Sequence, residues 1–558
     1  MSLLLKRRFI RLFSISILLL ATCPLSVAER RERLIESWRP VHYEVSLVFD
    51  DKLTQLTSAR TELTIEIEKD EVSLIDMDFG DMRIDSVRID AMSANYIQKD
   101  GKLFVTLAGP SKKDERLKIA IEYHGRPKDG LILSTDKDGK PSVTGDNWPD
   151  RVHHWIPTLD HPSAKATVRF TVTAPARDLV VANGRLESTL SSSATTRTWV
   201  WNESVSISPY CMIVAVGQFA RLEAKDQSIT PLSYYVPQSD RRFAMQGFAP
   251  AAPSLKYFSE IVGEYPYEKL AMIVGATTFG GMENSSAIVF GSGLFNDFQT
   301  KQPRSKRFHI PTGLRDVVAH EVAHQWFGDS VTEATWADLW LSEGFATYFE
   351  GLFIEKYEGG NEFRSYMKTI AEKYFAYEMK SRTPIHDKET EGLKALLNSN
   401  VYDKGAWVLH MLRGVVGEKA FFQGLRDYYA KYRDSTATSE DLRAVFENVS
   451  GKDLKWFFTQ WIYNSGHPSY VVMWKWIPSG NANSSGTVEL EIRQTQRGDA
   501  FQNLLIIELR TPVGPQRTTV TPVEKHLEIS IPAAHEPIAI TLDPDQFVLK
   551  DVTYIRQD

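Results

Sequence analysis

The chain has few cysteines, no low-complexity tract and no excess of basic residues. Only Cys23 and Cys211 are cysteines among its 558 residues, which excludes a small scaffold held together by disulfides. Lys and Arg number 65 against 71 Asp and Glu, and the formal charge of −6 disfavours a nucleic-acid binder. The hydrophobic share is 42% and the charged share 24%, as in ordinary globular proteins. A chain of this length is too long for one core and predicts two to four domains.

Long hydrophobic runs are also lacking, and the one near the N-terminus is short. Lys6, Arg7, Arg8 and Arg11 precede an apolar run at 12–21, and Ser26-Val27-Ala28 then offers a small-x-small cleavage site. This order predicts an export signal at residues 1–28, with an uncleaved membrane anchor as the alternative. Its removal takes away four positive charges, which changes −6 to −10. One thiol and no internal disulfide would remain, which favours a bacterial periplasm over a disulfide-rich extracellular setting. We therefore expect an exported protein, periplasmic or secreted, with no stable membrane insertion once the signal is removed.

The most informative stretch is the pentad His320-Glu321-Val322-Ala323-His324. Two histidines four apart in a helix lie on one face, so both imidazoles can reach one ion. Zinc suits two imidazoles and one carboxylate with a fourth position open, and Glu321 is placed to act as a base there. Thr312 is the expected N-cap of this helix and Gly328 its expected C-terminal stop.

A third ligand is expected at Glu343, which follows His324 after 18 residues. The surrounding run of Leu339, Leu341, Phe345, Tyr348, Phe349 and Phe353 predicts a largely buried helix from about 337 to 357. An unpaired carboxylate there would be costly, and a metal ion resolves that cost. The sequence therefore predicts one Zn²⁺ held by His320, His324 and Glu343.

By predicted secondary structure, the rest of the chain divides into a β region, a mixed α/β region and a second β region. Alternating runs such as 42–49, 62–67 and 117–122 predict an antiparallel β domain over 29–235, which on pattern alone could be a scaffold or a carbohydrate-binding module. Residues 236–467 predict a mixed α/β domain, with a helix at 249–263, a strand at 270–275 and amphipathic helices near 406–415, 421–432, 440–448 and 454–463. Short alternating runs over 468–558 predict a small β-sandwich.

Three separate motifs together resemble one known family. The pentad with Glu343, the upstream Gly280-Gly281-Met282-Glu283-Asn284 and the downstream Val401-Tyr402-Asp403-Lys404-Gly405 are similar to those of the gluzincin zinc aminopeptidases, the family of aminopeptidase N and leukotriene hydrolase. The resemblance runs from about residue 38 to the end of the chain. It implies a multidomain α+β fold whose catalytic domain is thermolysin-like, and a metalloprotease that hydrolyses the N-terminal bond of peptides.

The resemblance also implies roles for individual residues. Glu321 would be the general base, and Tyr402 would stabilise the oxyanion. Glu283 would bind the α-ammonium group of the substrate. Gly280 and Gly281 would pair with the peptide backbone, and Met282 would floor the pocket for the first side chain.

Some positions depart from the family pattern. Gly281 stands where alanine is frequent, and Ser342 and Asp329 stand where asparagine is usual. In the family, the N-terminal domain often supplies a glutamine or glutamate that helps to hold the substrate amine. The corresponding place in this chain falls near Asp146 and Asn147, which leaves open whether either residue has this role. The large helical C-terminal domain of longer members is also lacking, so we expect an open cleft that admits longer peptides; a rate that falls steeply beyond three or four substrate residues would count against this.

Two other functions remain open at this stage. A gluzincin endopeptidase is one, although a buried Glu283 in the amine subsite disfavours internal peptide. An inactive peptide-binding or adhesion protein is the other, although His320, Glu321, His324, Glu343 and Tyr402 are all present. The sequence indicates neither the preferred first side chain nor the oligomeric state.

Overall fold

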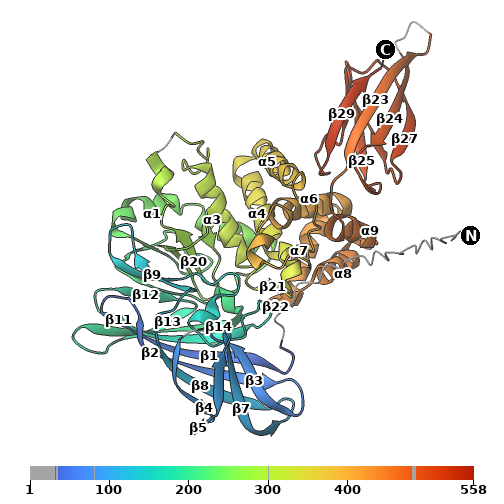
Figure 1. Cartoon of the computed structure of the whole chain (residues 1–558). Coiled ribbons are helices and arrows are strands. Elements are labelled where there is room, and N and C mark those ends of the chain that lie inside the picture. The colour runs from blue at the N-terminus through green and yellow to red at the C-terminus, as the bar shows by residue number, and fades with distance from the viewer. Residues whose placement is uncertain (1–31, 33–34, 81, 300, 481–484, 558) are drawn as a thin grey trace, which may run out of the picture.

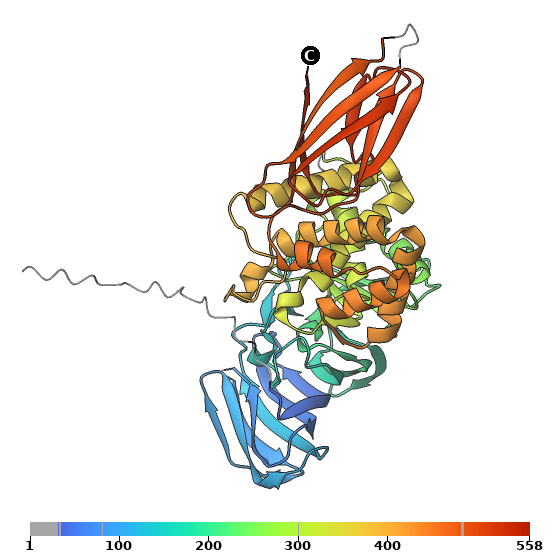
Figure 2. The same cartoon turned by 90° about the vertical axis from the view of Figure 1, so that its right-hand side faces the viewer.

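The computed structural model describes residues 32, 35–80, 82–299, 301–480 and 485–557. An N-terminal β region lies at one end of the molecule, a mainly helical region in the middle and a β-sandwich at the other end (Figures 1 and 2). This arrangement confirms the expected multidomain α+β class. The expected export signal lies outside the described residues.

The N-terminal region is built on an eight-stranded sheet, and strict alternation in its strands explains why. In β1 (Trp38–Phe49) the buried residues Tyr43, Val45 and Leu47 alternate with half-exposed neighbours, so one face joins the core. The pairing of β1 with β11 (Ala166–Pro175) is parallel, whereas the other pairings of this sheet are antiparallel. In spatial order the strands are β13 (Arg185–Ser191), β14 (Thr196–Ile207), β11 (Ala166–Pro175), β1 (Trp38–Phe49), β2 (Leu56–Ile67), β8 (Arg116–Gly125), β4 (Arg83–Ile89) and β5 (Met92–Ser93).

Two smaller sheets complete this region. One contains β3 (Val72–Asp78), β7 (Lys102–Ser111) and β6 (Tyr96–Lys99), and the other contains β12 (Leu179–Ala182), β15 (Val214–Gly217), β10 (Pro141–Gly145) and β9 (Leu131–Thr135). The loop after β10 carries Trp148 toward the helical region, where its ring meets Trp336 edge-on at 5.9 Å. The N-terminal region thus packs directly against the helical region.

The middle region combines a five-stranded sheet with helices. The strand order is β16 (Ala220–Glu223), β17 (Leu232–Val236), β18 (Leu270–Gly275), β20 (Ala287–Gly291) and β19 (Gly281–Met282). The boundary expected near residue 235 therefore falls inside β17 and cuts this sheet. The short strands β21 (Val331–Glu333) and β22 (Ser435–Ala437) pair with each other in a separate two-stranded sheet. The exact division into domains stays a prediction.

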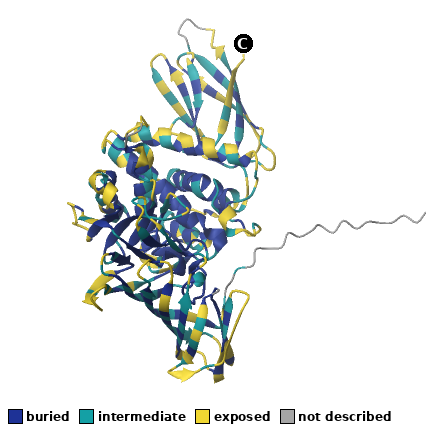
Figure 3. Cartoon of the chain, turned by 60° about the vertical axis from the view of Figure 1, so that its left-hand side comes forward, coloured by how far each residue is buried: buried dark blue, intermediate teal, exposed yellow. Residues whose placement is uncertain are grey.

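Buried residues are concentrated in the middle region, where its helices pack together (Figure 3). Helix α4 (Trp340–Glu358) is buried along nearly its whole length, because Phe345, Phe349 and Phe353 pack against aromatic rings on neighbouring helices. The helices are α1 (Arg241–Gly247), α2 (Ala251–Ile261), α3 (Thr312–His324), α4 (Trp340–Glu358), α5 (Gly360–Glu378), α6 (Gly405–Val416), α7 (Glu418–Tyr432), α8 (Ser439–Ser450) and α9 (Lys455–Phe458). None of the helices in the described part of the chain has the length and apolar character that a membrane crossing requires.

The C-terminal region is a sandwich with a core of its own, which includes Tyr470, Val472, Leu490 and Ile507. One sheet contains β27 (His526–Ala533), β24 (Gly486–Gln494), β23 (Ser469–Pro478) and β29 (Asp551–Arg556), and the other contains β26 (Gly514–Val520), β25 (Leu505–Thr511) and β28 (Ala539–Leu542). The small sandwich expected from the sequence is present.

A buried histidine joins the helices to the segment that leads into β29. The Nε2 atom of His410 lies 3.1 Å from the carbonyl oxygen of Gln546, and its Nδ1 atom lies 3.2 Å from the Tyr348 hydroxyl oxygen. The ring also stacks on Phe547 at 4.9 Å. Burial, aided by the nearby Arg413 charge, lowers the pKa of His410 to about 3, so the folded protein holds this imidazole neutral.

Because of His410, the free energy of unfolding should decrease as the pH falls below about 6.5. An unfolded chain takes up a proton near pH 6.5, whereas the folded chain does so only near pH 3, so stability is lost as pH falls between these values. Chemical denaturation of wild type and His410→Gln should show an extra slope of about 1.4 kcal/mol per pH unit in the wild type between about pH 6 and 4. Parallel pH profiles for the two proteins would contradict this assignment.

Candidate metal centre and active site

Helix α3 brings the two histidines of the pentad onto one face. Its opposite side is buried through Val318 and Val322, which fixes the rotation of the helix. Thr312 is the first helical residue and Pro311 occupies the cap position without a side-chain hydrogen bond, so the expected Thr312 cap is wrong. The helix ends at His324, and Gly328, with a φ of +120°, serves the turn that follows rather than the helix end.

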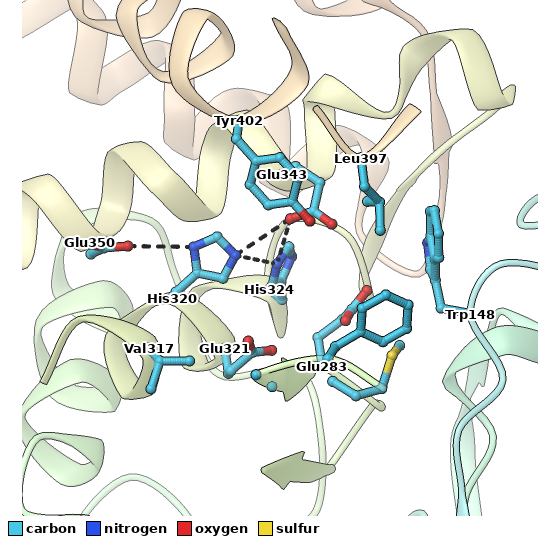
Figure 4. Close-up of a pocket in the computed structure, with 14 residues that line it drawn as sticks. Trp148, Glu283, Val317, His320, Glu321, His324, Glu343, Glu350, Leu397 and Tyr402 are labelled. Carbon is cyan, nitrogen blue, oxygen red and sulfur yellow. Dashed lines mark hydrogen bonds and ion pairs between the residues drawn. The ribbon is translucent and has the colours of Figure 1, made fainter. Parts of the chain in front are cut away.

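The side chains of His320, His324 and Glu343 converge on one point (Figure 4). The Oε2 atom of Glu343 lies 3.4 Å from His320 Nε2 and 3.3 Å from His324 Nε2. The two Nε2 atoms lie 3.1 Å apart. Ligands of a tetrahedral zinc ion at ordinary bond lengths are separated by about 3.3 Å, so the three atoms have the spacing of such a site.

The surroundings of these atoms also fit a cation. Glu343 Oε2 is buried and accepts no hydrogen bond from the described residues, which would be costly without a positive partner. His324 Nδ1 lies 3.2 Å from the Phe327 carbonyl oxygen and 3.2 Å from Ser342 Oγ. A proton on Nδ1 satisfies that carbonyl and leaves the Nε2 lone pair free for a metal. The residues present therefore fit a bound zinc ion.

Glu321 lies beside this site, against the backbone of Gly281. A Cβ atom at position 281 would stand 2.1 Å from Glu321 Oε1, so the glycine provides the space that the carboxylate occupies. Burial raises the pKa of Glu321 to about 7, which is suited to exchanging a proton near neutral pH. Its Oε2 atom has no hydrogen-bond partner among the described residues.

Tyr402 reaches the site from a short π-helical segment, Asn400–Lys404, that leads into α6. Its ring stacks on that of His320, with centroids 6.1 Å apart and planes 19° apart. Burial, with Glu343 nearby, raises the pKa of Tyr402 well above its usual value. The hydroxyl group therefore stays protonated and can donate a hydrogen bond.

The opposite wall comes from β19 and the loop that follows it. Gly281 and Met282 pair with Phe290 and Val289 of β20, and Glu283 comes next in the chain. Glu283 is 6% exposed, and burial raises the pKa of its carboxyl group. Glu283 thus lines the same cavity as Gly281 and Met282.

All nine predicted site residues line one cavity of about 330 Å³. They are Gly280, Gly281, Met282, Glu283, His320, Glu321, His324, Glu343 and Tyr402. The sequence reasoning missed five further lining residues: Trp148, Phe279, Val317, Glu350 and Leu397. Of these, Glu350 lies 3.6 Å from His320 Nδ1, and its position two turns after Glu343 on α4 was a usable signal. Trp148 comes from another region of the chain, and no sequence pattern indicated that it lines the cavity.

Neither Asp146 nor Asn147 lines this cavity, although the family's place for a second amine-binding residue falls near them. Asp146 pairs with Arg151 at 3.0 Å and accepts hydrogen bonds from Thr277 and Thr278. Asn147 accepts a hydrogen bond from Trp155 Nε1 at 2.9 Å. The neighbouring Trp148 lines the cavity instead, so an aromatic side chain stands where a polar group was anticipated.

Comparison with known proteins agrees with this geometry. The peptidase M1 N-terminal domain model matches residues 39–211, and the peptidase family M1 domain model matches residues 249–461. Together the two segments cover more than half of the chain. The chain belongs to peptidase family M1.

Individual relatives are similar at modest identity. Aminopeptidase 2 of Candida albicans is 26% identical over 465 residues, which are 79% of this chain and 49% of the relative. Leucyl aminopeptidase of Saccharolobus solfataricus is 26% identical over 423 residues, which are 72% of this chain and 51% of the relative. The chain spans about half the length of these curated relatives. The crystal structure of an M1 zinc metallopeptidase from Deinococcus radiodurans has a TM-score of 0.62 at 24% identity, covering 74% of this chain and 91% of that one, and so shares the fold.

Proposed function

We propose that this chain is a zinc-dependent aminopeptidase that hydrolyses the N-terminal peptide bond of peptides. The observation that carries the proposal is one cavity that joins a zinc-type triad to a buried carboxylate, Glu283, in a position to bind an amine. Membership of family M1 and the named activity of its relatives support the same function.

His320, His324 and Glu343 would hold the zinc ion. When bound, zinc acts as a Lewis acid that makes water more acidic and polarises a carbonyl group. Glu321 would take the proton of the attacking water and pass it to the leaving amine, because its carboxylate faces the same cavity. The Tyr402 hydroxyl would donate a hydrogen bond to the oxyanion as negative charge develops on the carbonyl oxygen.

Glu283 would bind the free α-ammonium group and so fix which peptide bond lies over the metal. Gly280 and Gly281 would offer backbone groups to the substrate, since neither carries a side chain to block its approach. Met282, only 1% exposed, would contact the first side chain. Trp148, Leu397 and Glu283 lie to one side of the histidines, and Val317 and Glu350 lie to the other (Figure 4). The first residue would therefore bind on the Trp148 side.

Replacing Glu283 with glutamine tests this assignment. The variant keeps the size of the side chain and loses its charge, so the KM for a leucyl-anilide should rise by about tenfold or more with a smaller change in kcat. Steady-state kinetics with the free-amine substrate and its N-acetylated twin would measure the effect. An unchanged KM would remove Glu283 from amine binding.

Two other functions are distinguished by the same substrates. An endopeptidase would cleave longer blocked peptides, which a buried Glu283 disfavours because it would be left without a cationic partner. An inactive binding protein would take up zinc and cleave neither substrate. The presence of both Glu321 and Tyr402 in the cavity favours an active enzyme.

We also infer export to the periplasm or the medium, with cleavage after Ala28. The basic start, the short apolar run and the small residues before Glu29 support this. N-terminal sequencing of the protein from an exporting bacterium should begin at Glu29. A chain that keeps residues 1–28 and sediments with membranes would instead indicate an anchor.

A further inference from the structure

The loop that carries Glu283 has an unusual backbone. Ser286, three residues later, has a φ of +61°, a left-handed conformation that costs energy for a residue with a side chain. Such a conformation persists only where the surroundings determine it strongly. The contacts around residues 283–286 therefore determine where Glu283 lies.

Buried polar groups from several elements hold this loop. Lys269 donates to the Ser286 carbonyl oxygen at 2.8 Å, and Asn183 of the N-terminal region donates to the Ser285 carbonyl oxygen at 2.6 Å. The Ser286 hydroxyl donates to Glu203 at 2.9 Å. These contacts fix the far end of the loop, while the end next to Glu283 depends on Gln325.

Gln325 directly follows the second histidine of the pentad and is fully buried. Its side-chain NH₂ group donates to the Glu283 carbonyl oxygen at 2.8 Å and to Asp329 Oδ2 at 2.8 Å. Its side-chain oxygen accepts from the Ser286 N–H group at 2.8 Å and, at 3.2 Å, from the Tyr265 hydroxyl, whose single proton is shared with the Lys269 carbonyl oxygen at 2.9 Å. Both donors and both lone pairs of the amide are thus used, which leaves it one orientation.

We propose that Gln325 is a positioning residue that sets the distance between the metal-binding helix and the amine-binding carboxylate of Glu283. Because its backbone continues α3 and its amide grips both ends of the loop 283–286, a shift of the helix is transmitted to Glu283. This matters because the peptide amine and the scissile bond must be held at a fixed separation. The inference rests on the proposed aminopeptidase function for its kinetic consequence, but the structural link stands apart from it.

Two variants and one control test the proposal. Gln325→Met removes all four hydrogen bonds at similar size. The double variant Gln325→Glu/Asp329→Asn exchanges donor and acceptor between positions 325 and 329 and keeps acceptors for Ser286 and Tyr265. It replaces the bond to the Glu283 carbonyl oxygen, 2.8 Å long in wild type, by a repulsive contact between two acceptor oxygens. The control is Gln460→Met, because Gln460 makes a comparable pair of amide hydrogen bonds to the Gln502 backbone outside the cavity lining.

The kinetic measurement compares inhibition by leucine hydroxamate with inhibition by the same hydroxamate lacking the amine. The inhibition constant of the hydroxamate without the amine, divided by that of leucine hydroxamate, reports how much the amine contributes to binding. Both Gln325 variants should reduce this ratio by about tenfold while zinc content stays at the wild-type level. The Gln460→Met control should keep the wild-type ratio.

Hydrogen exchange gives a second measurement that needs no activity. Amide exchange at residues 283–287 should be faster in Gln325→Met than in wild type, because the Ser286 N–H group has lost its acceptor. Wild-type exchange and an unchanged ratio would overturn the proposal, as would loss of zinc with equal weakening of both hydroxamates. If wild type itself shows no preference for the amine, the aminopeptidase function fails, and the exchange data still decide whether Gln325 holds the loop.

Discussion

Glu321→Gln should lower kcat by about a thousandfold. Glutamine keeps the shape of the side chain beside Gly281, but an amide cannot take a proton from water or return it to the leaving amine. The substitution removes no zinc ligand, so the variant should still bind about one zinc ion per chain. Steady-state rates on a leucyl-anilide, with metal analysis of the same sample, measure both quantities.

The control for this result is the KM of the variant. If Glu321 acts only on the proton, KM should change little while kcat collapses. Residual activity within a few-fold of wild type would show that another group is the base. Loss of zinc from the variant would show that Glu321 helps to hold the metal, contrary to its assignment.

Glu343→Ala should remove zinc as well as activity. The carboxylate is the third ligand, and two imidazoles alone leave a site with too few protein ligands for tight binding. We expect the zinc content after dialysis to fall from about one per chain to a small fraction of that value. Rates should fall by about a thousandfold or more, with partial recovery only at high zinc concentration.

A matched carboxylate on the same helix provides the control. Glu350 faces His320 Nδ1 at 3.6 Å but is not placed to touch the ion, so Glu350→Gln should reduce zinc affinity by only about ten- to a hundredfold. Competition with a chromogenic chelator would measure both variants. Equal zinc affinity in Glu343→Ala and wild type would contradict the proposed ligand set.

The site was predictable from the sequence where its residues are close in sequence or follow a helical period. His320, His324 and Glu343 could be placed because two helices with buried faces present them. Helix α5 was missed even though Phe363, Met367, Ile370 and Tyr374 are buried on one of its faces. That spacing is a helical signal of the ordinary kind, so this omission was avoidable.

Other parts of the site depend on contacts between distant segments. Trp148 lines the cavity because the loop after β10 packs on Trp336. The hydrogen bonds of Gln325 to the 283–286 loop can be recognised only when the positions of α3 and of that loop are known. Periodicity reports which face of an element is buried, not which element covers it. For the same reason the sequence did not show that β16 and β17 belong to the sheet of β18.

Aminopeptidase activity is decided by offering the purified protein a leucyl-anilide and its N-acetylated twin, with and without a zinc chelator. We expect cleavage of the free amine only, loss of cleavage with chelator and recovery on addition of zinc. Cleavage of the acetylated substrate at a similar rate, or no cleavage of either by a zinc-loaded protein, would contradict the proposed aminopeptidase function.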